Sequence, residues 1–146
     1  MRALTLDASV FVSAVRAKEP DHENSLACLT QMRQTSVRLF LPTLVLAEVV
    51  AALSRTGFTE ENALAFALRI AKLPNITFIS LDEALAREAS ALAARHKLRG
   101  ADSIYLATAA LVGATLITLD NEQRKRSTEI VNAISPRDFL NLSESQ

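Results

Sequence analysis

Short apolar runs of strand length recur along the chain, and longer segments with apolar residues at helical spacing separate them. Four runs and a weaker fifth have strand character: Ala3–Leu6, Val37–Leu41, Ile76–Ile79, Thr115–Leu119 and Ile130–Val131. The helical spacing predicts six helices: Val10–Arg16, His22–Arg33, Leu44–Ser54, Glu60–Lys72, Glu83–His96 and Asp102–Val112. This alternation predicts βα crossovers, and therefore an α/β fold with three α/β/α layers around a mostly parallel sheet of about four or five strands.

Residues that favour helix N-termini precede three of the predicted helices. Pro42-Thr43 and Thr59 each stand before one, and Ser80 with Glu83 three residues later matches a capping box. Asp82 also follows a strand, but the capping box explains it, so we leave it out of the candidate site.

The size and composition indicate one domain with a substantial core. The chain has 146 residues, 49% of them hydrophobic, and contains only three glycines and four prolines. No repeat or linker interrupts it. We expect a single domain over residues 1–142 and a frayed tail over residues 143–146.

Charge and cysteine content restrict the class of protein. Sixteen basic and sixteen acidic residues cancel, so the broad positive surface of a DNA-coating protein is not expected. The single cysteine, Cys28, lies in an apolar helical segment and reads as a buried thiol. The N-terminal segment has the length of neither a signal peptide nor a membrane span, which favours a cytoplasmic protein.

Two aspartates follow predicted strands. Asp7 ends the first strand, and Asp120 ends the strand that includes Thr118. The carboxyl ends of parallel strands are where α/β sheets bind ligands, so both side chains are expected at one edge. Asp7 could equally be a helix N-cap, since strand-to-helix turns often carry one.

Two further carboxylates interrupt apolar helices. Glu48 is the only charged residue in Leu44–Leu53, a segment apolar on every side and therefore expected to be buried. A buried carboxylate requires a cation, a hydrogen-bond network or a water-filled cleft, and a lone arginine partner is the plainer alternative. Asp102 opens another apolar helix, where the helix dipole alone would also favour it.

The four carboxylates together predict a cation site. If Asp7, Glu48, Asp102 and Asp120 converge, their repulsion demands a divalent cation, and hard oxygen ligands suit Mg²⁺ or Mn²⁺. Zinc is disfavoured, because the two histidines are far apart in sequence and lack ligand spacing with the cysteine.

The same residues resemble the signature of PIN-domain nucleases, particularly the small VapC-like toxins of toxin–antitoxin pairs, over nearly the whole chain. Asp7 with Ser9 resembles the opening acid motif, Glu48 the helical glutamate, and Gly100–Ala109 the segment in which Asp102 precedes alanines. Thr118-Leu119-Asp120 resembles the Thr-x-Asp motif. After that motif the toxins often carry an acid and then an aromatic residue, whereas here Gln123 replaces the aromatic one.

The resemblance implies an RNA endonuclease that leaves a 5′-phosphate and a 3′-hydroxyl, as the toxin of a toxin–antitoxin pair. Asp7, Glu48, Asp102 and Asp120 would be the catalytic and metal-binding residues for Mg²⁺ or Mn²⁺, with Ser9 and Thr118 donating hydrogen bonds around them. It also implies a homodimer and a cognate antitoxin. The alternative is a catalytically silent PIN-like module that only binds RNA or a protein.

Basic residues flank two of the acids and could guide RNA to an acidic site. The predicted RNA-binding residues are Arg95, Lys97 and Arg99 before Asp102, and Arg124, Lys125 and Arg126 after Asp120. The plainer interpretation is a solvated helix end, since lysine and arginine favour helix C-termini.

Two other α/β classes fit poorly. A response-regulator receiver needs a second acid near Asp7 and a lysine directly after Thr118, and neither is present. A phosphatase of the Asp-x-Asp type needs an acid at the position of Ser9.

Overall fold

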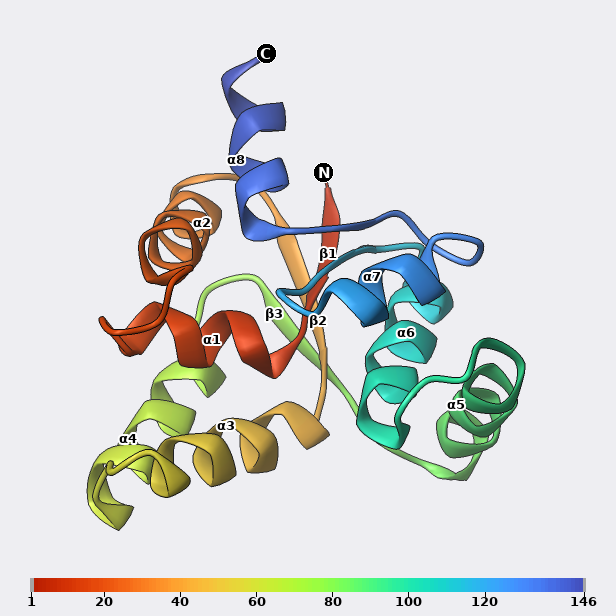
Figure 1. Ribbon diagram of the computed structural model, residues 1–146, viewed down its shortest axis with the longest axis horizontal. Helices are drawn as coiled ribbons and strands as arrows, with labels where there is room; N and C mark the ends of the chain where they lie inside the picture. Colours follow the sequence, from red (N-terminus) through yellow and green to blue (C-terminus); the bar gives the residue numbers. More distant parts are fainter. Residues whose placement is uncertain (1, 146) are drawn as a thin grey trace.

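The computed structural model describes residues 2–145, in which strands alternate with helices (Figure 1). The strands are β1 (Ala3–Leu6), β2 (Arg38–Pro42), β3 (Ile76–Ile79), β4 (Thr115–Ile117) and β5 (Ala133–Ile134). The helices are α1 (Ala8–Val15), α2 (His22–Gln34), α3 (Leu44–Arg55), α4 (Glu60–Ala71), α5 (Glu83–His96), α6 (Gly100–Val112), α7 (Asn121–Ser127) and α8 (Pro136–Glu144).

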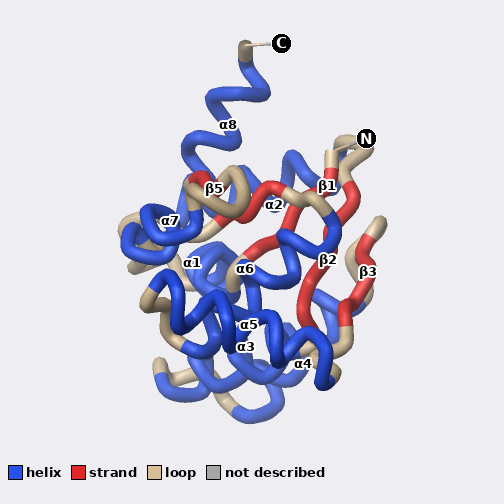
Figure 2. Tube along the Cα trace, turned by 90° about the vertical axis from the view of Figure 1, so that its right-hand side faces the viewer, coloured by secondary structure: helices blue, strands red, loops and turns tan. Residues whose placement is uncertain are grey.

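All five strands form one parallel sheet in the order β3-β2-β1-β4-β5. β5 and β3 lie at its two edges (Figure 2). Helices α1–α4 lie on one side of the strands and α5–α7 on the other, while α8 packs on α2 (Figure 1). The predicted three-layer α/β/α fold with a parallel sheet is therefore confirmed.

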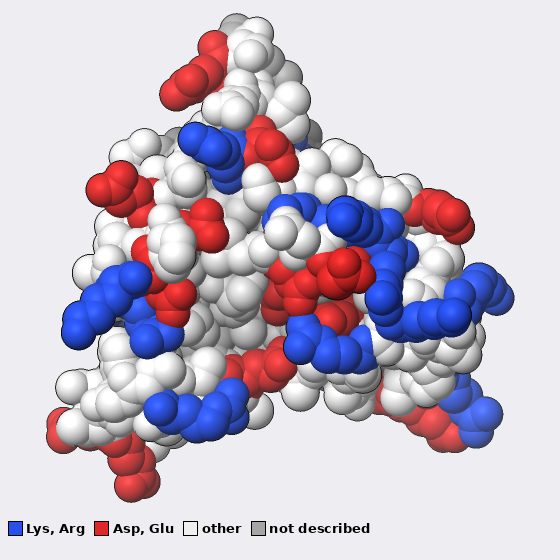
Figure 3. Space-filling view, in the orientation of Figure 1, with Lys and Arg blue, Asp and Glu red and all other residues white. Residues whose placement is uncertain are grey.

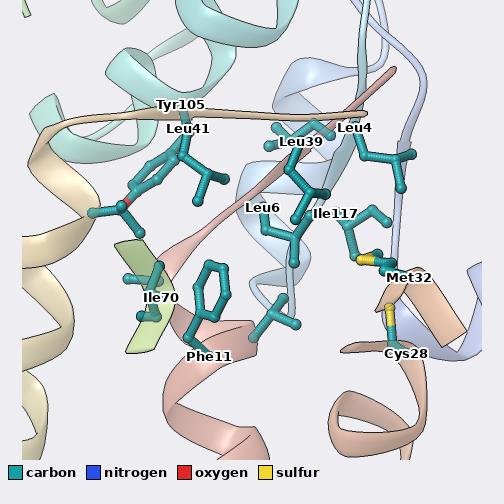
Figure 4. Close-up of a cluster of buried hydrophobic side chains, with 14 of the residues drawn as sticks. Leu4, Leu6, Phe11, Cys28, Met32, Leu39, Leu41, Ile70, Tyr105 and Ile117 are labelled. Carbon is teal, nitrogen blue, oxygen red and sulfur yellow. The ribbon is translucent and has the colours of Figure 1, made fainter. Parts of the chain in front are cut away.

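The main core lies between the sheet and the α1–α4 layer. Leu4 and Leu6 of β1, Leu41 of β2 and Phe11 of α1 are all buried in this one cluster, which Figure 4 shows. Cys28 is also buried in this cluster, as its apolar surroundings predicted. Within residues 2–145, no helix is long and apolar enough to cross a membrane.

Most predicted elements lie within one or two residues of the observed ones, and β5 is the main exception. Its pairing with β4 begins at Ala133, three residues after the predicted start. The reason is local: the backbone N–H groups of Ile130 and Val131 donate to the Ser127 carbonyl, which extends the end of α7 into a turn. Residues in that turn cannot also join the sheet.

Helix α3 is less buried than its sequence suggested. Only Val45, Val49 and Leu53 are fully buried, because the helix packs on α1 and α4 through one face. The prediction of burial on every side was wrong. The face that carries Glu48 is half-buried and borders a pocket.

Three helix starts were predicted, and one has the expected cap. Thr43 is at the N-cap position of α3, but its side chain makes no capping hydrogen bond. Thr59 caps α4 by accepting a hydrogen bond from the Asn62 N–H, as expected. The predicted capping box at Ser80 is wrong, because Asp82 caps α5 and accepts from the Leu85 N–H at 2.8 Å. The sequence places Ser80 two residues too early to serve the first turn.

Helices α7 and α8 were not predicted. A true capping box starts α8, where Ser135 and Asp138 exchange hydrogen bonds. Of the tail expected at residues 143–146, Ser143 and Glu144 belong to α8, and Gln146 lies outside the described residues.

Candidate functional site

The sheet order places two of the predicted carboxylates at a switch point. β1 lies between β2 and β4, and the connections from β1 and β4 leave in opposite directions. Asp7 directly follows β1, and Asp120 follows β4 after a two-residue bend. Such a point opens a crevice beyond the carboxyl ends of the strands, where α/β sheets bind ligands.

All four predicted carboxylates line one pocket of about 700 Å³. They come from four different parts of the chain: Asp7 from the β1–α1 junction, Glu48 from α3, Asp102 from α6 and Asp120 from the start of α7. In the space-filling view, acidic side chains gather near the centre of the face, with basic side chains above, beside and below them (Figure 3).

Asp7 is the most buried of the four, with 7% of its surface exposed. Its Oδ2 accepts hydrogen bonds from the Ser9 hydroxyl at 2.9 Å and from the Thr118 hydroxyl at 2.7 Å. Burial raises the pKa of Asp7; the two hydrogen bonds oppose this rise, and the charges of Asp102 and Glu48 add to it. Asp7 does not cap α1 with its side chain, so the N-cap interpretation does not account for it.

Ser9 and Thr118 also fasten the loop after β4 to Asp7. The Ser9 oxygen accepts from the Leu119 N–H at 3.3 Å, and the Thr118 oxygen accepts from the Asp120 N–H at 3.1 Å. Each hydroxyl therefore accepts from the loop backbone and donates to Asp7. The structure thus places both predicted donors beside this carboxylate.

Glu48 has an unsatisfied oxygen. Its Oε1 is buried and has no hydrogen-bond partner among the described residues, and the same holds for the hydroxyl of Tyr105. Burial, and then the nearby Glu48 carboxylate, raise the pKa of Tyr105, so its hydroxyl stays protonated. No arginine pairs with Glu48 in the described part of the chain.

Asp102 and Asp120 share a cationic partner, Arg99. The Arg99 Nε lies 3.0 Å from Oδ2 of Asp102, and its Nη2 lies 2.5 Å from Oδ2 of Asp120. Burial raises the pKa of Asp102, Arg99 lowers it, and the charge of Asp120 raises it further. Asp120 also caps α7, because its Oδ1 accepts from the Gln123 N–H at 3.0 Å.

The donor set fits a hard divalent cation, although its members do not form a finished cage. Four carboxylates border one pocket, and the buried Glu48 Oε1 forms no hydrogen bond with the described residues, although the Tyr105 hydroxyl lies close to Glu48. Within residues 2–145, however, no three acidic, histidine or cysteine side chains meet at coordination spacing. Arg99 explains part of this, because it holds Asp102 and Asp120 around its own guanidinium.

The basic residues predicted for RNA binding are not equivalent. Arg124 donates to the Thr118 carbonyl at 2.7 Å and contacts Asn121, so it braces the loop that carries Asp120. Arg126 pairs with Glu122 and donates to the Lys97 carbonyl. Arg99 pairs with Asp102 and Asp120. The remaining three are exposed: Arg95 and Lys97 at the end of α5, and Lys125 on α7.

Some residues around the site were missed from the sequence. Glu19, Asp21 and Arg55 line the pocket, although Glu19 and Asp21 lie in the turn between α1 and α2. Glu19 and Asp21 lie in a polar stretch of sequence, so they did not stand out as Glu48 did in its apolar helix. Gln123 is buried, and its amide oxygen lies 2.9 Å from the Thr118 hydroxyl oxygen. In the sequence, only the glutamine at a position where related toxins often carry an aromatic residue pointed to it.

The sequence and the fold were compared with those of known proteins. The sequence profile of the PIN domain matches residues 4–128. Among solved structures, the VapBC2 complex of Rickettsia felis bound to a promoter DNA fragment is similar, with 18% identity, a TM-score of 0.66, and coverage of 90% of this chain and 98% of that one. VapC20 of Mycobacterium tuberculosis, a sarcin–ricin loop cleaving toxin, is 16% identical, with a TM-score of 0.71 and coverage of 84% and 93%. FitAcB of Neisseria gonorrhoeae is 19% identical, with a TM-score of 0.65 and coverage of 92% and 98%. No curated protein matches the chain.

Proposed function

The chain belongs to the PIN domain family, and we propose that it is a Mg²⁺- or Mn²⁺-dependent endoribonuclease, the toxin of a toxin–antitoxin pair. One observation carries the proposal: four carboxylates from separate elements border a single pocket, and a buried Glu48 oxygen there has no partner among the described residues. A purely structural set of acids would be expected to have its buried oxygens satisfied by the protein.

Asp7, Glu48, Asp102 and Asp120 would hold the cation. A bound divalent cation would lower the pKa of the attacking water and neutralise charge on the scissile phosphate. The residues themselves provide position: Ser9 and Thr118 orient Asp7, and Tyr105 lies buried beside Glu48. No side-chain nucleophile is needed, so the chain contributes geometry and electrostatics.

Arg99 would have two roles in this site. Without a cation it neutralises Asp102 and Asp120, which relieves repulsion between them. A cation bound to these carboxylates would leave Arg99 unpaired at the edge of the pocket, where 76% of its side chain is already exposed. Its guanidinium could then contact a phosphate of the RNA backbone.

The proposal extends to a homodimer and an antitoxin. Large apolar side chains are exposed on two helices, Leu64 and Leu68 on α4 and Leu111 on α6, which is surface that self-association or a partner would cover. A similar solved structure is a toxin–antitoxin complex from Klebsiella pneumoniae. Light scattering on the purified chain, alone and after co-expression with the product of the adjacent reading frame, tests both parts. A monodisperse monomer that captures no such product would contradict them.

The enzymatic proposal is tested by cleavage of single-stranded RNA in Mg²⁺, Mn²⁺ or EDTA. We expect cleavage only with a cation, and products with a 5′-phosphate and a 3′-hydroxyl. Asp102→Asn should lower the rate at least about a hundredfold, the upper end of the loss expected for groups that merely support ligands.

Asp82→Asn is the matched control, because Asp82 also stands at a helix start but caps α5 with its side chain. Asparagine keeps that cap, so cleavage should be unchanged. Full activity in EDTA would refute metal dependence. RNA binding without cleavage under any cation would instead support a silent binding module.

A further inference from the structure

A buried glutamine lies next to Thr118, which donates a hydrogen bond to Asp7, the most buried carboxylate of the site. Gln123, on α7, has 1% of its surface exposed. Its amide oxygen is 2.9 Å from the Thr118 hydroxyl oxygen, and its amide nitrogen has no hydrogen-bond partner among the described residues. A buried, unpaired amide N–H is expensive in free energy, so this arrangement calls for an explanation.

The hydroxyl of Thr118 has only one proton, but two acceptors surround it. Asp7 Oδ2 lies 2.7 Å away and the Gln123 amide oxygen 2.9 Å away, and one proton cannot serve both. The two ends of a glutamine amide have nearly the same shape, so a half-turn exchanges oxygen for nitrogen without moving other atoms. After that turn, the Gln123 N–H donates to Thr118.

The turned amide satisfies the hydroxyl completely. Thr118 Oγ1 then accepts two hydrogen bonds, one from the Asp120 N–H at 3.1 Å and one from Gln123, which uses both of its lone pairs. Its single proton is left for Asp7. The hydroxyl can no longer rotate away from the carboxylate without losing a buried hydrogen bond.

We propose that Gln123 is a positioning residue for Asp7: its amide N–H donates to Thr118 Oγ1 and so directs the only hydroxyl proton of Thr118 onto Asp7 Oδ2. The inference rests on the proposed function in one respect, that Asp7 is a cation ligand. Gln123 touches neither the cation nor the substrate. It acts through Thr118, and it fixes which lone pairs of Asp7 remain open to a ligand.

A double-mutant cycle in EDTA tests the hydrogen-bond chain itself. Urea unfolding is measured for the parent, Gln123→Met, Thr118→Val and the double variant, since methionine is similar in length but has no amide. The effect of Gln123→Met on the unfolding equilibrium should differ by about two- to ten-fold between the parent and the Thr118→Val variant, as expected for one hydrogen bond. Equal effects in both proteins would refute the chain.

Mn²⁺ titration calorimetry on the same proteins tests the effect on the ligand. Gln123→Met should weaken the Kd for Mn²⁺ by about three- to ten-fold, somewhat less than a group that contacts a ligand directly. In the Thr118→Val background, Gln123→Met should not raise the Kd for Mn²⁺ any further. In the Thr118→Ser background, which keeps the hydroxyl, Gln123→Met should again cause the full loss of Mn²⁺ affinity. A loss of the same size in Thr118→Val would mean that Gln123 does not act through the hydroxyl.

Ser127→Ala is the control for packing of α7. Ser127 lies one turn after Gln123 and is fully buried, with a hydroxyl that has no partner among residues 2–145. Its variant should leave the Mn²⁺ Kd unchanged. If the parent itself binds no Mn²⁺, the proposed function fails, and the unfolding cycle still decides whether Gln123 directs the Thr118 proton.

Discussion

Arg99 lies between Asp102 and Asp120, where the proposed cation would bind, and this leads to an unusual expectation: removing Arg99 should tighten metal binding. For a cation to reach both carboxylates, Arg99 must give up its contacts at 3.0 and 2.5 Å. Arg99→Gln removes that competition. It also removes a positive charge that would repel the incoming cation.

The size of the effect follows from the exposure of the pair. With 76% of its side chain exposed, Arg99 forms ion pairs of the surface kind, worth about 0.2–1 kcal/mol each. Two of them give about 0.4–2 kcal/mol, and every 1.4 kcal/mol is a tenfold change in a dissociation constant. Arg99→Gln should therefore lower the Kd for Mn²⁺ by about two- to thirty-fold. The gain should shrink at high salt, because exposed pairs are screened.

Titration calorimetry with Mn²⁺ at two ionic strengths measures the change, and Arg95→Gln provides the control. Arg95 is an exposed arginine that is not among the residues lining the pocket, so its variant should keep the parent affinity. RNA cleavage by Arg99→Gln should fall although the metal binds more tightly, because a phosphate contact is lost. An affinity that is unchanged or weaker in Arg99→Gln would show that Arg99 does not compete with the cation.

Three further predictions concern other residues. Burial raises the pKa of Asp7 above its ordinary value of 3.8. The protonated form therefore contributes stability below pH 3.8, and this contribution is lost as the pH rises through the folded-state pKa. In EDTA, Asp7→Asn should raise the Tm at neutral pH and should give no gain below pH 3.8. Arg124→Ala should lower the Tm in thermal melts, because Arg124 donates a hydrogen bond to the Thr118 carbonyl. The exposed Lys125 has a different expected role: Lys125→Ala should leave the Tm unchanged but reduce the salt slope of RNA binding, measured by titration, by about one. Burial raises the pKa of Cys28 to about 12, so a colorimetric thiol reagent should react with it only after denaturation.

The strands and the larger helices were predictable because each buries an apolar face, and burial leaves a periodic pattern. Helix α7 was not, because all seven residues of Asn121–Ser127 are polar and no apolar period exists to be detected. Its start could have been found from Asp120, which caps it. Helix α8 likewise carried a readable start in Ser135, Pro136 and Asp138.

The four carboxylates were also predictable, since a charge in an apolar segment and acids at strand ends stand out in one sequence. What surrounds them was less accessible. Arg99 was predicted as an RNA contact, but its pairing with Asp120 joins residues 21 positions apart and depends on how α6 and β4 pack. The contact of Thr118 with Asp7, 111 positions apart, was anticipated only through a family resemblance.

These contacts divide the site into a fixed part and an exchangeable part. Asp7 is buried and is held by neutral hydroxyl donors, which can stay in place whether or not a cation is present. Asp102 and Asp120 are held by an exposed arginine, whose weak pairs a cation can replace. If all four carboxylates were buried and held by neutral hydroxyls, as Asp7 is, their negative charges would not be neutralised. If all four were held by exposed arginines, they would lack a defined ligand geometry. In the proposed enzyme, this combination would let the protein fold without metal and still present a fixed carboxylate to the cation.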